Sequence, residues 1–144
     1  MNITVRKATL CDAHALCRLN GEGMGYEYPA EKTAENLKAT LEKEYERVFV
    51  AEVCGETVGY IHACIYGLLF AEKGINILGI AVAENYTRKG VGRALMNELE
   101  NWARTQGATY IRLVSGESRH GAHAFYEKCG YKSNKTQKNY KKKL

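Results

Sequence analysis

The chain has 144 residues, of which 45% are hydrophobic and 26% charged, values typical of a single globular domain that we expect to span residues 1–144. Much of the net charge of +5 lies in tail lysines such as Lys138 and residues 141–143, where solvated lysines are the usual explanation, so we expect no nucleic-acid partner. The odd number of cysteines, 5, and the absence of an apolar signal core or membrane-length apolar run disfavour disulfides, metal sites and membrane contact, and predict a cytoplasmic protein.

The N-terminal third of the chain predicts one strand and two helices. Residues 3–6 form a short β-rich strand, and a capping pattern at Thr9 predicts a helix that runs to about Asn20. Residues 21–30 contain several glycines and the only proline, which is typical of a loop. Thr33 is expected to cap the second helix.

The middle of the chain predicts a β-hairpin followed by a buried strand. Residues 47–53 and 57–69 are β-rich and are separated by a short turn that contains Gly55. His62 lies on the face of the second strand that also carries two tyrosines. Residues 75–82 are a continuous apolar run, which is typical of a central strand.

A glycine turn and a helix follow this central strand. The helix prediction rests on apolar residues that are spaced four, four and three apart, followed by Gly107 as a stop. These apolar residues are Val91, Leu95, Leu99 and Trp102.

The start of this helix has the composition of an anion-binding site. The first backbone N–H groups of a helix lack intrahelical partners and lie at the positive end of its dipole. Gly90 and Gly92 let phosphates approach the main chain without meeting a β-carbon. Full positive charges are added by Arg88, Lys89 and Arg93. A phosphate-bearing ligand is therefore predicted.

Two familiar phosphate motifs do not match the glycine turn. The chain has no Gly-x-x-x-x-Gly-Lys-Ser/Thr run, and the dinucleotide fingerprint would need a glycine at Leu95 and an acid at Arg112.

A third pattern does match. Residues 80–82 followed by Thr87-Arg-Lys-Gly-Val-Gly resemble the acetyl-CoA motif of the GNAT superfamily of N-acetyltransferases, Gln/Arg-x-x-Gly-x-Gly/Ala after a Leu/Ile-x-Val strand. Thr87 stands at the Gln/Arg position, and neighbouring Arg88 is the substitute for that contact to the pyrophosphate. The resemblance implies acetyl-CoA as cosubstrate, with binding residues Ile80, Ala81, Val82, Thr87, Arg88, Lys89, Gly90, Val91, Gly92, Arg93 and Arg119.

The C-terminal part carries a second point of resemblance. Residues 109–115 alternate as a strand, and residues 131–143 can form a last polar hairpin. Between them, Ser118 caps a short helix that Gly130 closes. Residues 115–131 are similar to the Arg-x-x-Ala-His-x-Phe-Tyr-x-x-x-Gly-Phe/Tyr signature of a GNAT branch that includes aminoalkylphosphonate and other small-amine N-acetyltransferases.

The order of these elements predicts an α/β fold in which a mixed, mostly antiparallel sheet is flanked by about four helices. The GNAT acyltransferase fold has the same element order, so the resemblance covers essentially the whole chain. A homodimer is usual in that family and is expected here.

The resemblance assigns the general acid to Tyr126, whose phenol would protonate the departing thiolate of coenzyme A. Many relatives carry a glutamate as general base where this chain has Gly79. Glu27, Glu72 and His62 are substitutes by chemistry alone. Loop carboxylates are as often solvated charges, and a strand histidine is more often a satisfied core residue.

The other residues of the C-terminal signature leave alternatives open. Tyr126 could pack beside Phe125 without a catalytic role. Arg119 could contact the cofactor or pair with Glu117. His123 could order the site or bond a backbone carbonyl.

These patterns predict an acetyl-CoA-dependent N-acetyltransferase that transfers acetyl directly to a primary amine of a small molecule. A protein lysine or N-terminal acetyltransferase is the alternative within this class. A non-catalytic acyl-CoA-binding regulatory module is the alternative of another class, favoured by the missing glutamate and disfavoured by Tyr126. Glu22, Glu27 and Glu31 favour a cationic amine over a phosphonate, which would need arginines.

Overall fold

The computed structural model describes residues 1–144 apart from the side chain of Met24, and the chain falls into two units, residues 1–113 and 114–144. The strands, all in the first unit, are β1 (Thr4–Lys7), β2 (Glu46–Val53), β3 (Glu56–Tyr66), β4 (Gly74–Val82) and β5 (Tyr110–Arg112). The helices of this unit are η1 (Leu10–Asp12), α1 (Ala13–Met24), α2 (Ala30–Leu41), η2 (Glu84–Tyr86) and α3 (Val91–Thr105). The second unit contains α4 (His120–Lys128). A single domain over residues 1–144 stays a prediction.

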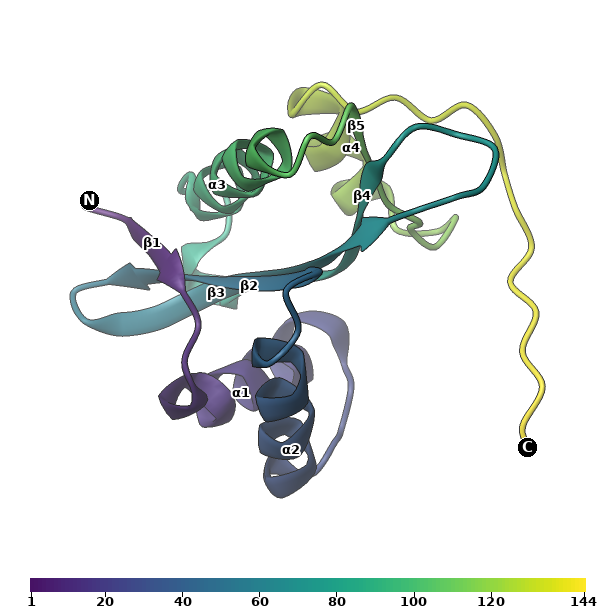
Figure 1. The fold of residues 1–144 in the computed structure, drawn as a ribbon. Helices are drawn as coiled ribbons and strands as arrows, with labels where there is room; N and C mark the ends of the chain where they lie inside the picture. Colours follow the sequence, from purple (N-terminus) through teal and green to yellow (C-terminus); the bar gives the residue numbers. More distant parts are fainter. The chain divides into compact units, whose positions relative to one another are not determined.

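The strands of the first unit form one five-stranded sheet in the order β1-β2-β3-β4-β5 (Figure 1). All neighbours are antiparallel except β4 and β5, which are parallel. The β2–β3 turn has left-handed backbone at Cys54 (φ 52°) and Gly55 (φ 77°), as a two-residue hairpin turn requires. The predicted fold class, a mixed and mostly antiparallel sheet with helices, is confirmed.

Helices cover both faces of this sheet within the first unit (Figure 1). On one face, the Tyr60 hydroxyl of β3 donates a hydrogen bond to Asn20 of α1. On the other face, the Arg47 guanidinium of β2 lies 5.4 Å from the ring centroid of Trp102 in α3. The largest fully buried side chains are Leu19, Ile61, Ile75, Leu95, Met96, Leu99, Val50, Val58 and Val91.

The boundaries of the first two helices differ from the sequence predictions. α1 continues through two glycines to Met24 and ends only where Gly25 adopts a left-handed conformation with φ 71°. α2 begins at Ala30, so Thr33 is not its cap but lies inside it. There the Thr33 hydroxyl donates to the Pro29 carbonyl oxygen at 3.1 Å.

The C-terminal predictions were less accurate. β5 is shorter than the predicted strand over residues 109–115, and α4 begins at His120 rather than directly after Ser118. The hairpin predicted over residues 131–143 is wrong, because residues 131–144, all in the described part of the chain, form neither strand nor helix. This stretch carries 6 lysines and few apolar side chains, so it has no apolar face to bury. Among the described residues, no helix is long and apolar enough to cross a membrane.

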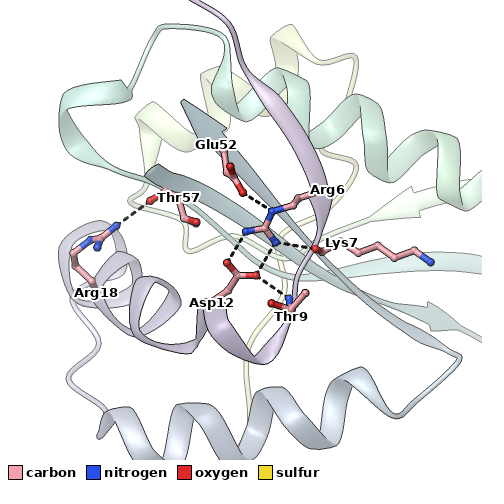
Figure 2. Close-up of polar contacts among 7 residues, drawn as sticks. All are labelled: Arg6, Lys7, Thr9, Asp12, Arg18, Glu52 and Thr57. Atoms are coloured by element: carbon pink, nitrogen blue, oxygen red, sulfur yellow. Dashed lines mark hydrogen bonds and ion pairs between the residues drawn. The ribbon is translucent and has the colours of Figure 1, made fainter. Parts of the chain in front are cut away.

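A charge network joins β1, β2 and the turn before α1 (Figure 2). The Arg6 guanidinium on β1 donates to both carboxylate oxygens of buried Asp12, at 2.8 and 2.9 Å, and also pairs with Glu52 on β2. Asp12 additionally accepts a hydrogen bond from the backbone N–H of Thr9 at 2.8 Å. The hydrogen bonds from Arg6 hold the pKa of Asp12 below its ordinary value of 3.8, so the carboxylate stays charged at neutral pH.

Replacing Asp12 with asparagine should lower the free energy of unfolding by about 1–2 kcal/mol at neutral pH, a range reduced because Arg6 is partly exposed to solvent. Since the folded-state pKa of Asp12 is depressed, its contribution is present above the unfolded-state pKa of about 4 and is lost as the pH falls through the folded-state value. Urea unfolding of parent and Asp12→Asn should therefore show a difference that narrows below about pH 4.

Exposed Glu44 provides the matched control, and Glu44→Gln should change stability by no more than about 0.5 kcal/mol. A difference between parent and Asp12→Asn that stays constant into the acid range would mean that the lost stability is not electrostatic.

Candidate active site

The N-terminus of α3 lies close against β3 because Gly59 has no side chain. A Cβ added to Gly59 would lie 3.0 Å from Cγ1 of Val91, the first residue of α3, and 3.3 Å from Cδ1 of Leu95. The buried stripe continues along α3 through Leu99, which holds the helix to the sheet. The unpartnered N–H groups of the first helical turn are therefore held beside the sheet.

The turn that leads into α3 has a left-handed backbone at two positions. Gly90 caps the helix with φ 90°, and Arg88 has φ 61°, a conformation that costs a residue with a side chain on the order of 1 kcal/mol or more. Such turns direct successive N–H groups toward one side and form concavities that bind anions. The exposed side chains of Arg88 and Lys89 add positive charge beside it.

Thr87, which departs from the acetyl-CoA motif, has a local structural role. Its hydroxyl donates to the Glu84 carbonyl oxygen at 2.9 Å, within the turn formed by η2. The neighbouring Lys89 ammonium lies 5.6 Å from the ring centroid of Tyr86. The Thr87 hydroxyl thus stabilises the turn that presents the helix start.

β4 offers free backbone groups next to this helix start. Its pairing with β5 ends at Asn76, so from Ile77 to Val82 β4 has no partner strand on that side among the described residues. On the β3 side the ladder shifts by one residue, which leaves Leu78 as a bulge beside Gly79. An extended ligand with amide groups can pair with this open edge while its phosphates reach the first turn of α3.

The opposite face of the sheet carries a cavity of about 150 Å³ under α1 and α2. Its polar lining includes Asn20, Tyr28, Thr33, Tyr60 and His62. Burial raises the pKa of Tyr60 to about 12, so its phenol stays neutral and donates to Asn20. The cavity lies against the face of β3 that carries Tyr60 and His62, two residues that the sequence analysis placed on one face.

His62 is paired with Glu46, its neighbour across the strands. The Nε2 atom of His62 lies 2.7 Å from Oε1 of Glu46, and the Lys43 ammonium lies 3.0 Å from Oε2. Burial raises the pKa of Glu46, but the hydrogen bonds from His62 and Lys43 outweigh this and hold it below the ordinary value of 4.5. The sequence analysis missed Glu46, since no spacing links it to His62.

The other two base candidates are surface residues of the first unit. Glu27 is exposed in the α1–α2 connection and lines an open cavity of about 450 Å³ together with Tyr26 and Tyr28. Glu72 is exposed in the connection between β3 and β4. The structure therefore brings His62 to the sheet beside β4, whereas Glu27 and Glu72 lie in separate loops.

The second unit contains Tyr126 and the remaining signature residues. Burial raises the pKa of the Tyr126 phenol above its ordinary value of 10.0, and the charge of Arg119 opposes this shift. Tyr126 also lies near Phe125, with ring centroids 5.6 Å apart. His123 Nε2 lies 2.8 Å from the carbonyl oxygen of Gly116, one of the two roles considered for it.

Comparisons of the sequence point to acetyltransferases. The model of a family described as the acetyltransferase (GNAT) family matches residues 13–131. A Sulfurisphaera tokodaii protein named N-alpha-acetyltransferase is 33% identical over 94% of this chain and 84% of that protein. A Stenotrophomonas maltophilia protein named aminoglycoside N(6')-acetyltransferase type 1 is 31% identical over 89% of this chain and 85% of that protein.

Two solved structures show that the fold is shared. The structure of a transcriptional regulator from Bacillus halodurans C-125 has a TM-score of 0.87 and 21% identity, covering 96% of this chain and 99% of that one. The structure of AAC(6')-Iy with the bisubstrate analogue CoA-S-monomethyl-acetylneamine has a TM-score of 0.87 and 14% identity, with full coverage of both chains at 100%.

Replacing Gly92 with glutamate should weaken acetyl-CoA binding by about 100-fold or more. The substitution places a negative charge in the first turn of α3, where phosphates are expected, and like charges brought together cost several kcal/mol. Calorimetric titration of parent and variant with acetyl-CoA measures the change.

Asn97→Glu is the control, because it adds the same charge to an exposed position of α3 beyond its first turn. It should bind acetyl-CoA like the parent. A folded Gly92→Glu protein with parental affinity would place the cofactor site elsewhere.

Proposed function

The chain belongs to the acetyltransferase (GNAT) family, and on this premise we propose that it transfers acetyl from acetyl-CoA directly to a primary amine of a small molecule. The broader activity is that of an N-acetyltransferase, an enzyme that uses acetyl-CoA as cosubstrate. The observation that carries the proposal is the helix start of α3 next to the open edge of β4, which suits a ligand with phosphates at one end and amides along its length.

The same stretch supports the binding residues of the cofactor. Ile80, Ala81 and Val82 belong to the unpaired edge of β4, which can form main-chain hydrogen bonds with the pantetheine amides. The turn from Thr87 to Arg93 supplies N–H groups and positive charges for the pyrophosphate. We also assign Arg119 of the second unit to the cofactor, by its place in the branch signature.

The reaction creates two negative charges: the oxyanion of the tetrahedral intermediate, which must be stabilised, and the thiolate of coenzyme A, which must be protonated. The amine attacks the thioester carbonyl, and the resulting oxyanion is stabilised by a backbone N–H of β4 near Ile80, close to the bulge at Leu78. The C–S bond then breaks, and Tyr126 protonates the thiolate. The phenol is protonated at neutral pH before the reaction, as a general acid must be, although burial raises its pKa and makes it a weaker acid.

The substrate class has two candidates within the same chemistry. An aminoglycoside acetyltransferase among the relatives supports a small-molecule amine, and the exposed Glu22, Glu27 and Glu31 favour a cationic one. Relatives named N-alpha-acetyltransferase favour the N-terminus of a protein instead. A regulatory module that binds acyl-CoA without catalysis is the candidate of another class.

A panel of polyamines, aminoglycosides, aminoalkylphosphonates and peptides separates these candidates by thiol release from acetyl-CoA. Fastest turnover with a small cationic amine is the expected result. Fastest turnover with a peptide N-terminus or lysine would contradict the proposed substrate class. Tight binding of acetyl-CoA without thiol release for any amine would favour the regulatory module.

Replacing Tyr126 with phenylalanine should lower kcat by about 10²–10⁴-fold, the usual effect of losing a general acid, and should leave acetyl-CoA affinity nearly unchanged. The ring remains, so its packing against Phe125 is preserved. Steady-state kinetics and calorimetry on the same proteins measure both quantities.

Tyr140 is 84% exposed, so Tyr140→Phe removes the same hydroxyl at a solvated position and should keep parental turnover. Parental turnover in Tyr126→Phe, under conditions where chemistry is rate-limiting, would make Tyr126 a packing residue and require another acid.

A further inference from the structure

His62 projects over the place on β4 where a side chain is missing. In the antiparallel β3–β4 pair, His62 lies directly opposite Gly79, and the bulge at Leu78 follows immediately. Residues directly opposite in such a pair share one face of the sheet, with Cβ positions about 5 Å apart. Because Gly79 has no side chain, the residue directly opposite on β4 does not cover the imidazole, beside the bulge that the reacting carbonyl is expected to approach.

The Glu46 carboxylate orients this imidazole. Oε1 of Glu46 lies 2.7 Å from Nε2 of His62, and the Glu46 side chain is only 9% exposed. A carboxylate accepts hydrogen bonds, so this contact makes Nε2 the donor and leaves Nδ1 as the basic nitrogen. Among the described residues, Glu46 is the hydrogen-bond partner recorded for the ring, and the ring borders the cavity under α1 and α2.

The other groups around His62 are poorly suited to accept a proton. Burial raises the pKa values of the Tyr60 phenol and of the Cys64 thiol, so both remain protonated at neutral pH. Glu46 is already engaged by His62 and Lys43. The α1–α2 connection adds Tyr28 to the cavity.

Among the described residues at this position, the helices and β4 contribute no acid or base. α1 and α2 add only uncharged side chains, which are Leu16, Asn20, Thr33, Asn36, Leu37 and Thr40. From β4, the residues opposite His62 are glycine and the bulged leucine. The imidazole of His62 is therefore the group left for this task.

We propose that His62, oriented by Glu46, is the general base that removes a proton from the substrate ammonium in the cavity under α1 and α2. The inference rests on the proposed function and deepens it by naming the base and the face of the sheet from which the amine enters. Glu46 is a positioning residue, which holds the ring and stabilises the imidazolium.

The proton balance of the reaction is complete with these groups. One proton passes from the substrate ammonium to Nδ1 of His62, which leaves a neutral amine with a free electron pair. The N–C bond forms, the C–S bond breaks, and the departing thiolate takes a proton from Tyr126. The second N–H proton leaves the nitrogen and passes through solvent to the Tyr126 phenolate, which restores the phenol. His62 releases its proton to solvent, so the net products are amide, free thiol and one proton.

The test compares His62→Gln with the parent over a range of pH, using the panel amine that gives the fastest thiol release. At pH 7 we expect kcat/KM to fall by about 100-fold or more. The loss should shrink as the pH approaches the amine pKa of about 10, because the amine is then neutral without a base. Acetyl-CoA affinity should not change.

Two further variants keep the test decisive if His62→Gln folds poorly. His62→Ala should regain activity when imidazole is added to the assay, as a missing base can be replaced from solution. Glu46→Gln should lower kcat/KM by about 10-fold or more at pH 7, the usual effect of losing a partner that orients a functional group. His14→Gln and Glu44→Gln change exposed side chains and should match the parent.

The outcomes separate this inference from the proposed function. A parent that releases no thiol with any amine overturns the proposed function, and this inference with it. If the parent is active but His62→Gln lowers kcat/KM equally at every pH, or does not lower it, the inference alone is overturned. The inference is confirmed if the loss of kcat/KM in His62→Gln at pH 7 disappears at high pH and if imidazole restores activity to His62→Ala.

Discussion

The contact between α3 and β3 at Gly59 is the constraint on which the candidate site depends. An added Cβ would lie 3.0 Å from Val91, so a larger residue would push the first turn of α3 away from the sheet. With glycine there, the unpartnered N–H groups of that turn lie beside β4, where the pairing with β5 has already ended. The proposed anion site thus adjoins the open strand edge.

Charge pairs organise the opposite face and the N-terminal edge of the same sheet. Arg6 joins β1 to the start of the first helices through Asp12, and to β2 through Glu52. On β3, His62 has Glu46 as its partner. The Arg6–Glu52 and His62–Glu46 pairs link residues that lie 46 and 16 positions apart in the chain, whereas Arg6 and Asp12 are only 6 apart. The start of α3, where we place the cofactor phosphates, and His62, the proposed base, lie on opposite faces of the sheet.

The relatives share the reaction and differ in the amine. Their names include both N-alpha-acetyltransferase and aminoglycoside N(6')-acetyltransferase, at 33% and 31% identity. Main-chain groups and a helix start bind a phosphate-bearing cofactor in much the same way whatever the side chains around them. In the proposed function the amine instead meets side chains of the α1–α2 connection and the cavity, such as Tyr26, Glu27 and Tyr28. Substrate choice is expected to vary there.

Local patterns in the sequence were sufficient for the strand, turn and helix from Ile75 to Ala103. Apolar spacing, Gly90 and the charges around it act over a few residues, and the matching family model supports the acetyltransferase identity that they suggested. Such patterns misjudged residues 131–143, which are rich in lysine, have no apolar face to bury and form no strand.

Long-range pairing set the rest of the site. The bulge at Leu78, which the sequence analysis did not predict, determines that Gly79 lies opposite His62. The pairing of β2 with β3 brings Glu46 to 2.7 Å from His62, although 16 residues separate them in the chain. Strand register depends on turns, bulges and the packing of both faces together, and no single stretch of sequence contains that information.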